Sequence, residues 1–256
     1  MGNLLKIELF KILKGKEKNV IILSFTFMIL SPLISIFLSE SSFDKEFLSN
    51  IYRFFEYNFS TLFPLSIGIF SIWNIGNEFK NKTIKYYIMS KYSRFQMLIA
   101  KFLSINIFTI ICFLITYILY CIIAFLTSDK VSVIVNFETI TTSSLILNLS
   151  LIGITTIFYI IAIVTFSITL AYIFKRQNVA ILIFIIITSL MLLLFGGIYE
   201  LSIIPRYSFF YASELYTLIW QFNNFHMFLR YILPCVSNIF ILLILSSVSF
   251  DKYKYK

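Results

Sequence analysis

Residues 78–101 read EFKNKTIKYYIMSKYSRFQMLIAK, and they form the longest charged interruption between two apolar segments of the chain. The stretch carries six Lys or Arg residues and a single acid, Glu78. A simple connection between two packed helices needs only a few residues. Length and charge therefore predict a basic, structured platform on which a partner docks. A solvated basic loop is the plainer alternative.

The same stretch divides into two helical pieces. Thr83 can begin a short helix, and the residues that follow Ser90 end it. Ser93 followed by Gln96 has the pattern of a capping box, in which each side chain bonds a backbone N–H of the other residue. The pattern predicts a short helix along the membrane surface, followed by a membrane helix that begins at Arg94.

The composition is that of a membrane protein. Hydrophobic residues make up 59% of the chain and charged residues 13%, with a mean hydropathy of +0.92. Soluble domains are about 45–50% apolar and about 25% charged. We therefore expect one transmembrane domain that covers residues 1–256, with no separate soluble domain.

Apolar runs of about 20 residues can cross the hydrocarbon as helices. The predicted fold is an all-α membrane protein with six transmembrane helices. The predicted spans cover residues 20–39, 54–77, 94–127, 145–174, 178–199 and 231–250.

Residues 3–17 predict an amphipathic helix that lies in the membrane interface. Leu5 and Leu9 mark its apolar face, and Glu8 and Lys11 mark the opposite, polar face. An irregular basic tail is the alternative.

The distribution of Lys and Arg orients the spans. The side that holds both termini, residues 78–101 and Lys175–Arg176 carries sixteen basic residues, and the other side carries five. Acids run the other way, with four on the first side and eight on the second. Both termini are therefore predicted to lie in the cytosol.

Residues 200–230 form a distinctive outer segment, with nine aromatic residues between Tyr207 and Phe228. The segment is too polar to span and too apolar to lie freely in water, so re-entrant or interfacial helices at headgroup depth are predicted. It can be a simple aromatic anchor, or an outer gate and substrate path for an amphipathic substrate. The candidate gate residues are Tyr211, Trp220, Phe222 and His226.

Several kinds of chemistry lack the residues they need. The sequence has no G-x-x-x-x-G-K-[ST] motif for nucleotide phosphates. The single histidine, His226, cannot form a paired-His metal site, and the three cysteines form no C-x-x-C motif. Six charge-free runs, residues 19–39, 57–77, 102–128, 139–174, 177–199 and 231–250, make up most of the predicted spans. They hold no Asp, Glu, Lys or Arg, which argues against a proton-driven carrier. We expect no enzyme activity, metal or cofactor on this chain, and an energy source outside the membrane domain.

The platform and the predicted topology together resemble the permease subunits of type-2 ATP-binding-cassette exporters. Between spans two and three, that family carries an acid, then Gly-Thr, then Pro-x-Ser-Arg, and a Lys at the start of span three. Glu78, Thr83, Ser93–Arg94 and Lys101 correspond to the acid, the threonine, the Ser-Arg pair and the lysine.

The sequence departs from this signature at two positions, because Lys82 stands for the glycine and Lys91 for the proline. The resemblance implies that residues 78–93 form a coupling helix region, which fits a cleft on a separate cytosolic ATPase subunit. ATP and magnesium bind to that subunit. The implied ATPase contacts are Glu78, Thr83, Lys85, Tyr87, Ser93 and Arg94.

The resemblance further implies a bacterial plasma membrane, a second permease subunit that is identical or a paralogue, contact with lipid, and no nucleic acid. The short, aromatic-rich chain is most similar to small lantibiotic-immunity and cytolytic-peptide exporter permeases. An amphipathic or antimicrobial peptide is therefore the expected cargo. The alternatives are an exporter of small hydrophobic drugs and a non-transporting membrane anchor or sensor that recruits a cytosolic partner.

Overall fold

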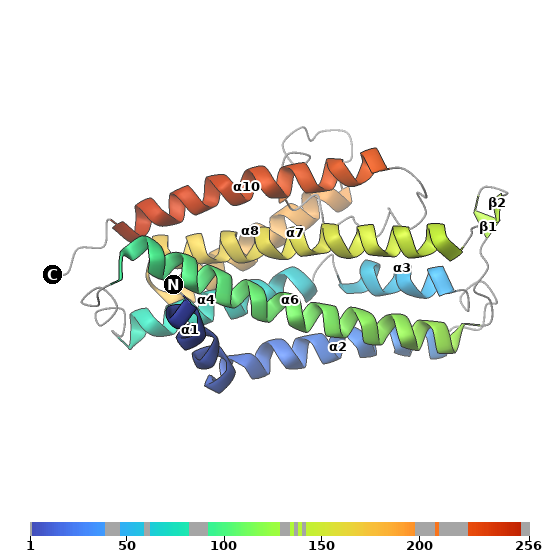
Figure 1. Cartoon of the computed structure of the whole chain (residues 1–256), viewed down its shortest axis with the longest axis horizontal. Coiled ribbons are helices and arrows are strands. Elements are labelled where there is room, and N and C mark those ends of the chain that lie inside the picture. Colours follow the sequence, from blue (N-terminus) through green and yellow to red (C-terminus); the bar gives the residue numbers. More distant parts are fainter. Residues whose placement is uncertain are drawn as a thin grey trace.

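The computed structural model describes residues 2–38, 47–58, 62–81, 92–128, 134–135, 138–139, 142–197, 208–209 and 225–251. Within these ranges the chain forms eight helices and one short antiparallel pair of strands (Figure 1). The helices are α1 (Gly2–Lys14), α2 (Glu17–Leu38), α3 (Phe47–Tyr57), α4 (Phe63–Lys80), α6 (Arg94–Thr127), α7 (Thr142–Phe174), α8 (Gln177–Gly197) and α10 (Phe225–Asp251). The strands are β1 (Ile134–Val135) and β2 (Glu138–Thr139).

Helix α7 is the centre of the bundle. The long helices lie roughly side by side, and α1 crosses the end of the bundle at which α6 begins (Figure 1). Helix α7 packs against α4, α6, α8 and α10. In its most apolar stretch 67% of the residues are buried, against 28% in α6 and 17% in α10. The latter two helices therefore form the outside of the bundle.

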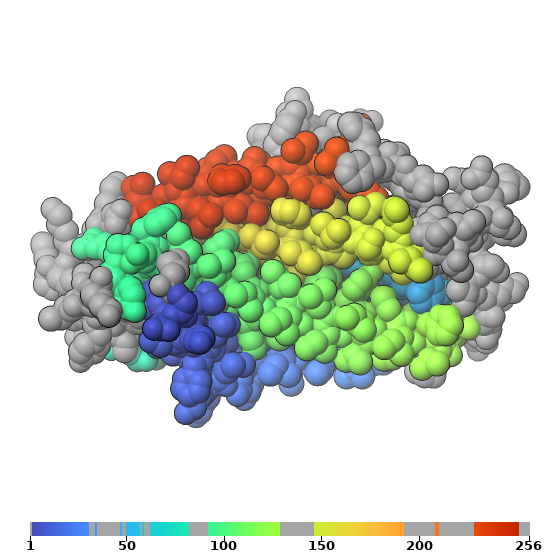
Figure 2. Space-filling view, viewed as in Figure 1, coloured from blue at the N-terminus to red at the C-terminus, as the bar shows by residue number. Residues whose placement is uncertain are grey.

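The outer helices present apolar side chains to their surroundings. Ile115 and Ile118 of α6 are 55% and 56% exposed, and Phe240 and Ile244 of α10 are each 65% exposed. Figure 2 shows α6 and α10 along one face of the molecule, with α1 at its end. An apolar surface of this extent suits contact with lipid rather than water.

Three helices in the described part of the chain are long and apolar enough to cross a membrane. They are α6, residues Ile146–Phe174 of α7 and residues Phe228–Phe250 of α10. Residues Gln177–Met191 of α8 form a shorter apolar helix. The molecule is thus a helical, multi-pass membrane protein, and the full set of six spans stays a prediction.

Helix α6 begins with the predicted capping box. The backbone N–H of Gln96 donates to Oγ of Ser93 at 3.2 Å, and the N–H of Ser93 donates to Oε1 of Gln96 at 3.0 Å. Two donors of the first turn, which have no acceptor within the helix, are therefore satisfied.

The second predicted span, residues 54–77, includes parts of two described helices. Helix α3 ends at Tyr57 and α4 begins at Phe63. Nδ2 of Asn58, the residue after α3, donates to the carbonyl of Met28 in α2 at 2.9 Å, which links this region to a neighbouring helix. Pro64 then suits the first turn of α4, where a missing N–H costs nothing.

Two helices begin before their predicted spans. Helix α10 begins at Phe225 rather than at residue 231, so the end of the outer aromatic segment is helical. Helix α7 begins at Thr142 rather than at residue 145, because part of the polar sequence before Leu145 belongs to the helix.

Two glycines set the distance between α4 and α8. A Cβ atom at Gly68 would lie 2.0 Å from Cζ of Phe184, and one at Gly76 would lie 2.7 Å from Cβ of Gln177. Phe184 is fully buried, and its ring centroid lies 5.9 Å from that of Phe166. Small residues allow membrane helices to approach closely. Gly68 and Gly76 allow α4 and α8 to do so.

The substitution Gly68→Ala should destabilise the protein by about 1–3 kcal/mol, because the added methyl group overpacks the contact with Phe184. Gly153→Ala is the matched control, since a Cβ there meets nothing closer than Tyr117 at 3.7 Å. It should leave stability unchanged or raise it by up to about 1 kcal/mol through helix propensity. Thermal unfolding in detergent measures both variants, and equal unfolding temperatures would contradict the close contact.

Candidate functional site

A buried ion cluster joins three helices at the end of the bundle where α6 begins. Nζ of Lys101 in α6 lies 3.1 Å from Oε2 of Glu8 in α1, and it also pairs with Oε1 of Glu78 in α4. The side chains of Lys101, Glu8 and Glu78 are only 5%, 4% and 12% exposed. An ion removed from water requires a partner of opposite charge, and here each ion has one.

Lys11 completes the cluster from its exposed side. Its Nζ atom lies 3.2 Å from Oε1 of Glu8 and 3.8 Å from Oε1 of Glu78, and the side chain is 46% exposed. The four side chains, two acids and two bases, sum to zero formal charge. The cluster is therefore electrically neutral as a unit.

The position of Glu8 differs from the sequence-based prediction, which placed it on the polar face of the N-terminal helix. Leu4, Glu8 and Ile12 are the buried residues of α1, and their spacing of four places them on one inward face. Phe10 and Leu13 point outward and are 56% and 53% exposed. The carboxylate of Glu8 turns inward because Lys101 is buried there.

The carboxyl end of α4 contacts the rest of the bundle through successive residues. Glu78 joins the ion cluster, and the ring of Phe79 meets that of Tyr172 in α7 edge-on, with centroids 5.9 Å apart. Tyr172 is 1% exposed, and its ring lies 4.9 Å from that of Phe250 in α10. The end of α4 is thus connected to α1, α6, α7 and α10.

The corner between α1 and α2 is fastened to the same place. Nδ2 of Asn77 in α4 donates to Oε1 of Glu17 in α2 at 2.5 Å. Gly15 lies in the corner, and a Cβ atom there would stand 3.1 Å from the carbonyl oxygen of Lys11, so this turn leaves little room for a side chain.

The structure describes some of the predicted platform residues. Glu78 belongs to the ion cluster, Ser93 caps α6, and Arg94 opens α6 with a partly exposed side chain. Thr83, Lys85 and Tyr87 lie outside the described residues. Direct ATPase contact by any of these six residues stays a prediction, and the inward position of Glu78 favours a role inside this chain.

The predicted gate residues lie mostly outside the described part. Tyr211, Trp220 and Phe222 are not among the described residues, and His226 is placed only as a backbone position in the first turn of α10. Within the described residues no group of three or more His, Cys, Asp or Glu side chains could hold a metal ion.

Sequence reasoning missed the partners of Lys101. The signal was present in part, because Lys101 falls among Leu98, Ala100 and Ile105 in a helix that buries that side. A lysine on a buried helical face predicts a nearby carboxylate. Which carboxylate it meets depends on how α1 crosses the bundle.

The arrangement defines a helical membrane domain with a buried charged junction between α1, α4 and α6. The sequence carries no G-x-x-x-x-G-K-[ST] motif. A model of the ABC-2 family transporter proteins matches residues 4–192, and the chain belongs to this family. The matched region runs from α1 into α8 and includes every member of the ion cluster. A search among curated proteins found no match.

Membership makes the chain the transmembrane permease component of an ABC transporter rather than its ATPase. It also implies that an ATPase subunit is the partner.

The substitution Lys101→Met should destabilise the protein by about 3–5 kcal/mol, because Glu8 and Glu78, both largely buried, lose the ammonium group that they share. Lys11→Met is the control, and loss of its half-exposed charge should cost less than about 1 kcal/mol. Adding Glu8→Gln and Glu78→Gln to Lys101→Met should restore most of the loss. Thermal unfolding of the purified permease measures the series. Equal unfolding temperatures for Lys101→Met and Lys11→Met would show that the buried ion pairs of Lys101 do not stabilise the protein.

Proposed function

We propose that this chain is the permease subunit of an ATP-driven exporter, in which the ion cluster of Glu8, Lys11, Glu78 and Lys101 carries movement from a docked ATPase into the membrane helices. The observation that supports this most is the pairing of Lys101 with both Glu8 and Glu78 at the foot of the predicted platform. Charges held in this way move together or separate at a high cost.

The docking surface in this proposal is the coupling region, residues 78–93. Helix α4 leads into it at Lys80, and the capping box at Ser93 leads out of it into α6. Glu78 and Lys101 pair across these two helices, so they close the base of the loop between them. A force applied to the loop therefore reaches both helices at once.

From this base the displacement has two routes into the bundle. Glu78 acts on α1 and α6 through Glu8 and Lys101, and Phe79 acts on α7 and α10 through Tyr172. Packed helices respond to such a displacement as rigid bodies that shift between discrete arrangements. The proposed transport cycle is a shift of this kind, with ATP and magnesium on the partner subunit.

The proposed cargo is an amphipathic or antimicrobial peptide, which leaves through a path between two permeases near residues 200–230. The aromatic content of that segment motivates the choice. The membrane is the bacterial plasma membrane, with both termini in the cytosol, and the second permease is identical or a paralogue.

Reconstitution with the ATPase of the same host tests this function. ATP hydrolysis that rises with an added amphipathic peptide, and ATP-dependent movement of that peptide across the liposome membrane, is the expected result. Movement of small hydrophobic dyes without peptide would indicate a drug exporter instead. Failure of any ATPase to co-purify, or binding with no movement, would indicate a non-transporting anchor and overturn the proposal.

Reversal of two platform charges should abolish transport without preventing insertion. In the Lys85→Glu, Arg94→Glu variant the basic surface offered to the ATPase changes sign, so docking should be lost. Lys6→Glu with Lys14→Glu is the matched control, because it reverses two exposed charges on α1. ATPase co-purification and peptide movement are measured for both. Transport that survives the platform reversal would show that the ATPase docks elsewhere.

Replacement of Trp220 and Phe222 by Ala should change which peptides are moved, because two large rings are removed from the proposed exit path. Docking of the ATPase should be unaffected. Competition between peptides of different hydrophobicity, measured in the same liposomes, reports the change in preference. Loss of permease assembly would instead assign the aromatic segment to structure.

A further inference from the structure

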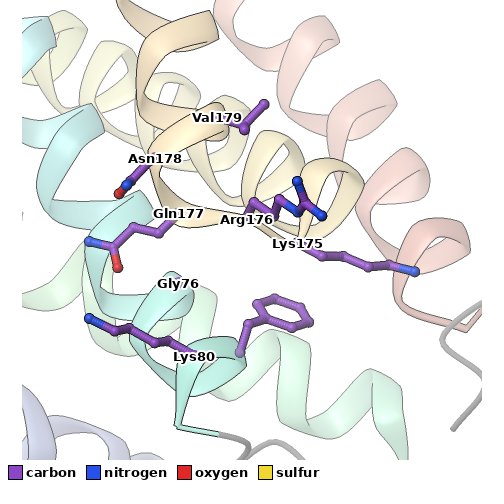
Figure 3. Close-up of a pocket in the computed structure, with 8 residues that line it drawn as sticks. Gly76, Lys80, Lys175, Arg176, Gln177, Asn178 and Val179 are labelled. Carbon is purple, nitrogen blue, oxygen red and sulfur yellow. The ribbon is translucent and has the colours of Figure 1, made fainter. Parts of the chain in front are cut away.

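A pocket of about 500 Å³ lies between the last turn of α4 and the turn that joins α7 to α8 (Figure 3). Gly76 and Lys80 line it from α4, and Lys175, Arg176 and the first residues of α8 line it from the other side. It shares no residue with the ion cluster. Phe79, which the proposed transport cycle uses, also lines it, but that cycle assigns the pocket no ligand.

The pocket is strongly basic. Lys80, Lys175 and Arg176 line it, and each of the three is exposed. None of the described residues that line it is acidic. Lys80 and Lys175 extend in opposite directions in Figure 3, so their ammonium groups lie on opposite sides of the pocket. Such a concentration of one sign of charge attracts an anion.

The start of α8 adds hydrogen-bond donors to these charges. The carbonyl of Arg176 accepts the N–H of Ala180 at 3.0 Å, so Arg176 stands at the N-terminus of a 21-residue helix. The N–H groups of the following residues, Gln177 and Asn178, have no acceptor within α8. Both residues line the pocket. The N-terminal end of a helix, with the positive end of its dipole, favours a phosphate group.

The geometry that builds the pocket is tightly constrained. Lys175 has a φ of 54°, a left-handed conformation that lets α8 start directly after α7. This turn places Lys175 and Arg176 side by side opposite α4. Gly76 holds α4 close, since a Cβ atom there would lie 2.7 Å from Cβ of Gln177.

An exposed apolar stripe leads away from the pocket along α8. Val179, Leu182, Ile186 and Leu190 are 39%, 58%, 48% and 54% exposed, and their spacing places them on one helical face. Val179 also lines the pocket. A ligand that fills both features has an anionic head and an apolar tail.

The expected depth of the pocket in the membrane also suits a ligand with an anionic head and an apolar tail. The apolar sequence of α7 ends at Phe174, and that of α8 begins at Val179. The three cations therefore lie where the helices leave the hydrocarbon, which is the depth of phospholipid headgroups.

We infer that this pocket binds the phosphate of an anionic phospholipid, whose acyl chains lie along the Val179–Leu190 stripe of α8. The charges, the donors and the stripe each serve one part of the same molecule. A free phosphate ion would use the pocket and leave the stripe unoccupied.

The test uses the full permease in nanodiscs of phosphatidylcholine, with or without phosphatidylglycerol. Native mass spectrometry after extraction counts retained phosphatidylglycerol, and thermal unfolding reports stabilisation. The variant Lys80→Gln, Lys175→Gln, Arg176→Gln should retain phosphatidylglycerol on the order of a hundredfold less tightly, from the usual contribution of each cation near a lipid surface. Arg176→Gln alone should lose about fivefold, which keeps the test valid if the triple variant is unstable.

The control variant is Lys6→Gln, Lys14→Gln, Lys16→Gln, which removes the same number of exposed charges from the N-terminal region. It should keep its tightly bound phosphatidylglycerol. Equal loss in both variants would reduce the effect to general attraction and overturn the proposal. Stabilisation by inorganic phosphate in pure phosphatidylcholine would make the pocket an ion site. Loss of ATPase binding with unchanged lipid retention in the triple pocket variant would make it a protein-docking surface.

Discussion

The position of Lys101 constrains the whole end of the bundle. Its ammonium group lies in the interior of the chain, and burial is tolerable only because two carboxylates from other helices meet it. This requirement fixes how α1 crosses α6 and how far α4 extends beside them. Replacement of a buried ion group by apolar residues is often neutral for stability. The cluster is therefore best understood as a device that specifies one arrangement of three helices, and its charges mark the place where those helices can be driven together.

The other contacts described above connect this junction to α7, α8 and α10. Helix α7 runs through the middle and meets most of the other long helices, and Tyr172 connects it to the end of α4. On the other side of α4, Gly68 and Gly76 remove side chains so that α8 can approach. The carboxyl end of α4 is thus held on several sides by ion pairing, ring contacts and close backbone packing. This packing suits the role proposed for α4, in which a displacement of its end reaches the neighbouring helices.

Local features of the sequence predicted part of this structure well. The capping box of Ser93 and Gln96 depends only on neighbouring residues, and α6 begins where it indicates. The helical membrane class followed from composition. Contacts between distant helices could not be predicted in this way, because they depend on how the helices pack. Glu8 and Lys101 are 93 positions apart, and helical periodicity alone allowed Glu8 to face water. The hydrogen bond from Asn58 to the carbonyl of Met28 likewise joins residues 30 positions apart, in a contact that periodicity does not predict. The ATPase contacts and the outer aromatic path depend on partners that this chain alone does not contain.

The ion cluster also bears on how the protein is made. Glu8 and Glu78 both precede Lys101 in the sequence, so their carboxylates are synthesised before their shared counter-ion. The buried ammonium group that joins them therefore comes last in the sequence. The junction of α1, α4 and α6 has its full set of charges only once the first turns of α6 are present. The position of the N-terminal helix thus depends on a residue 93 positions further along the chain.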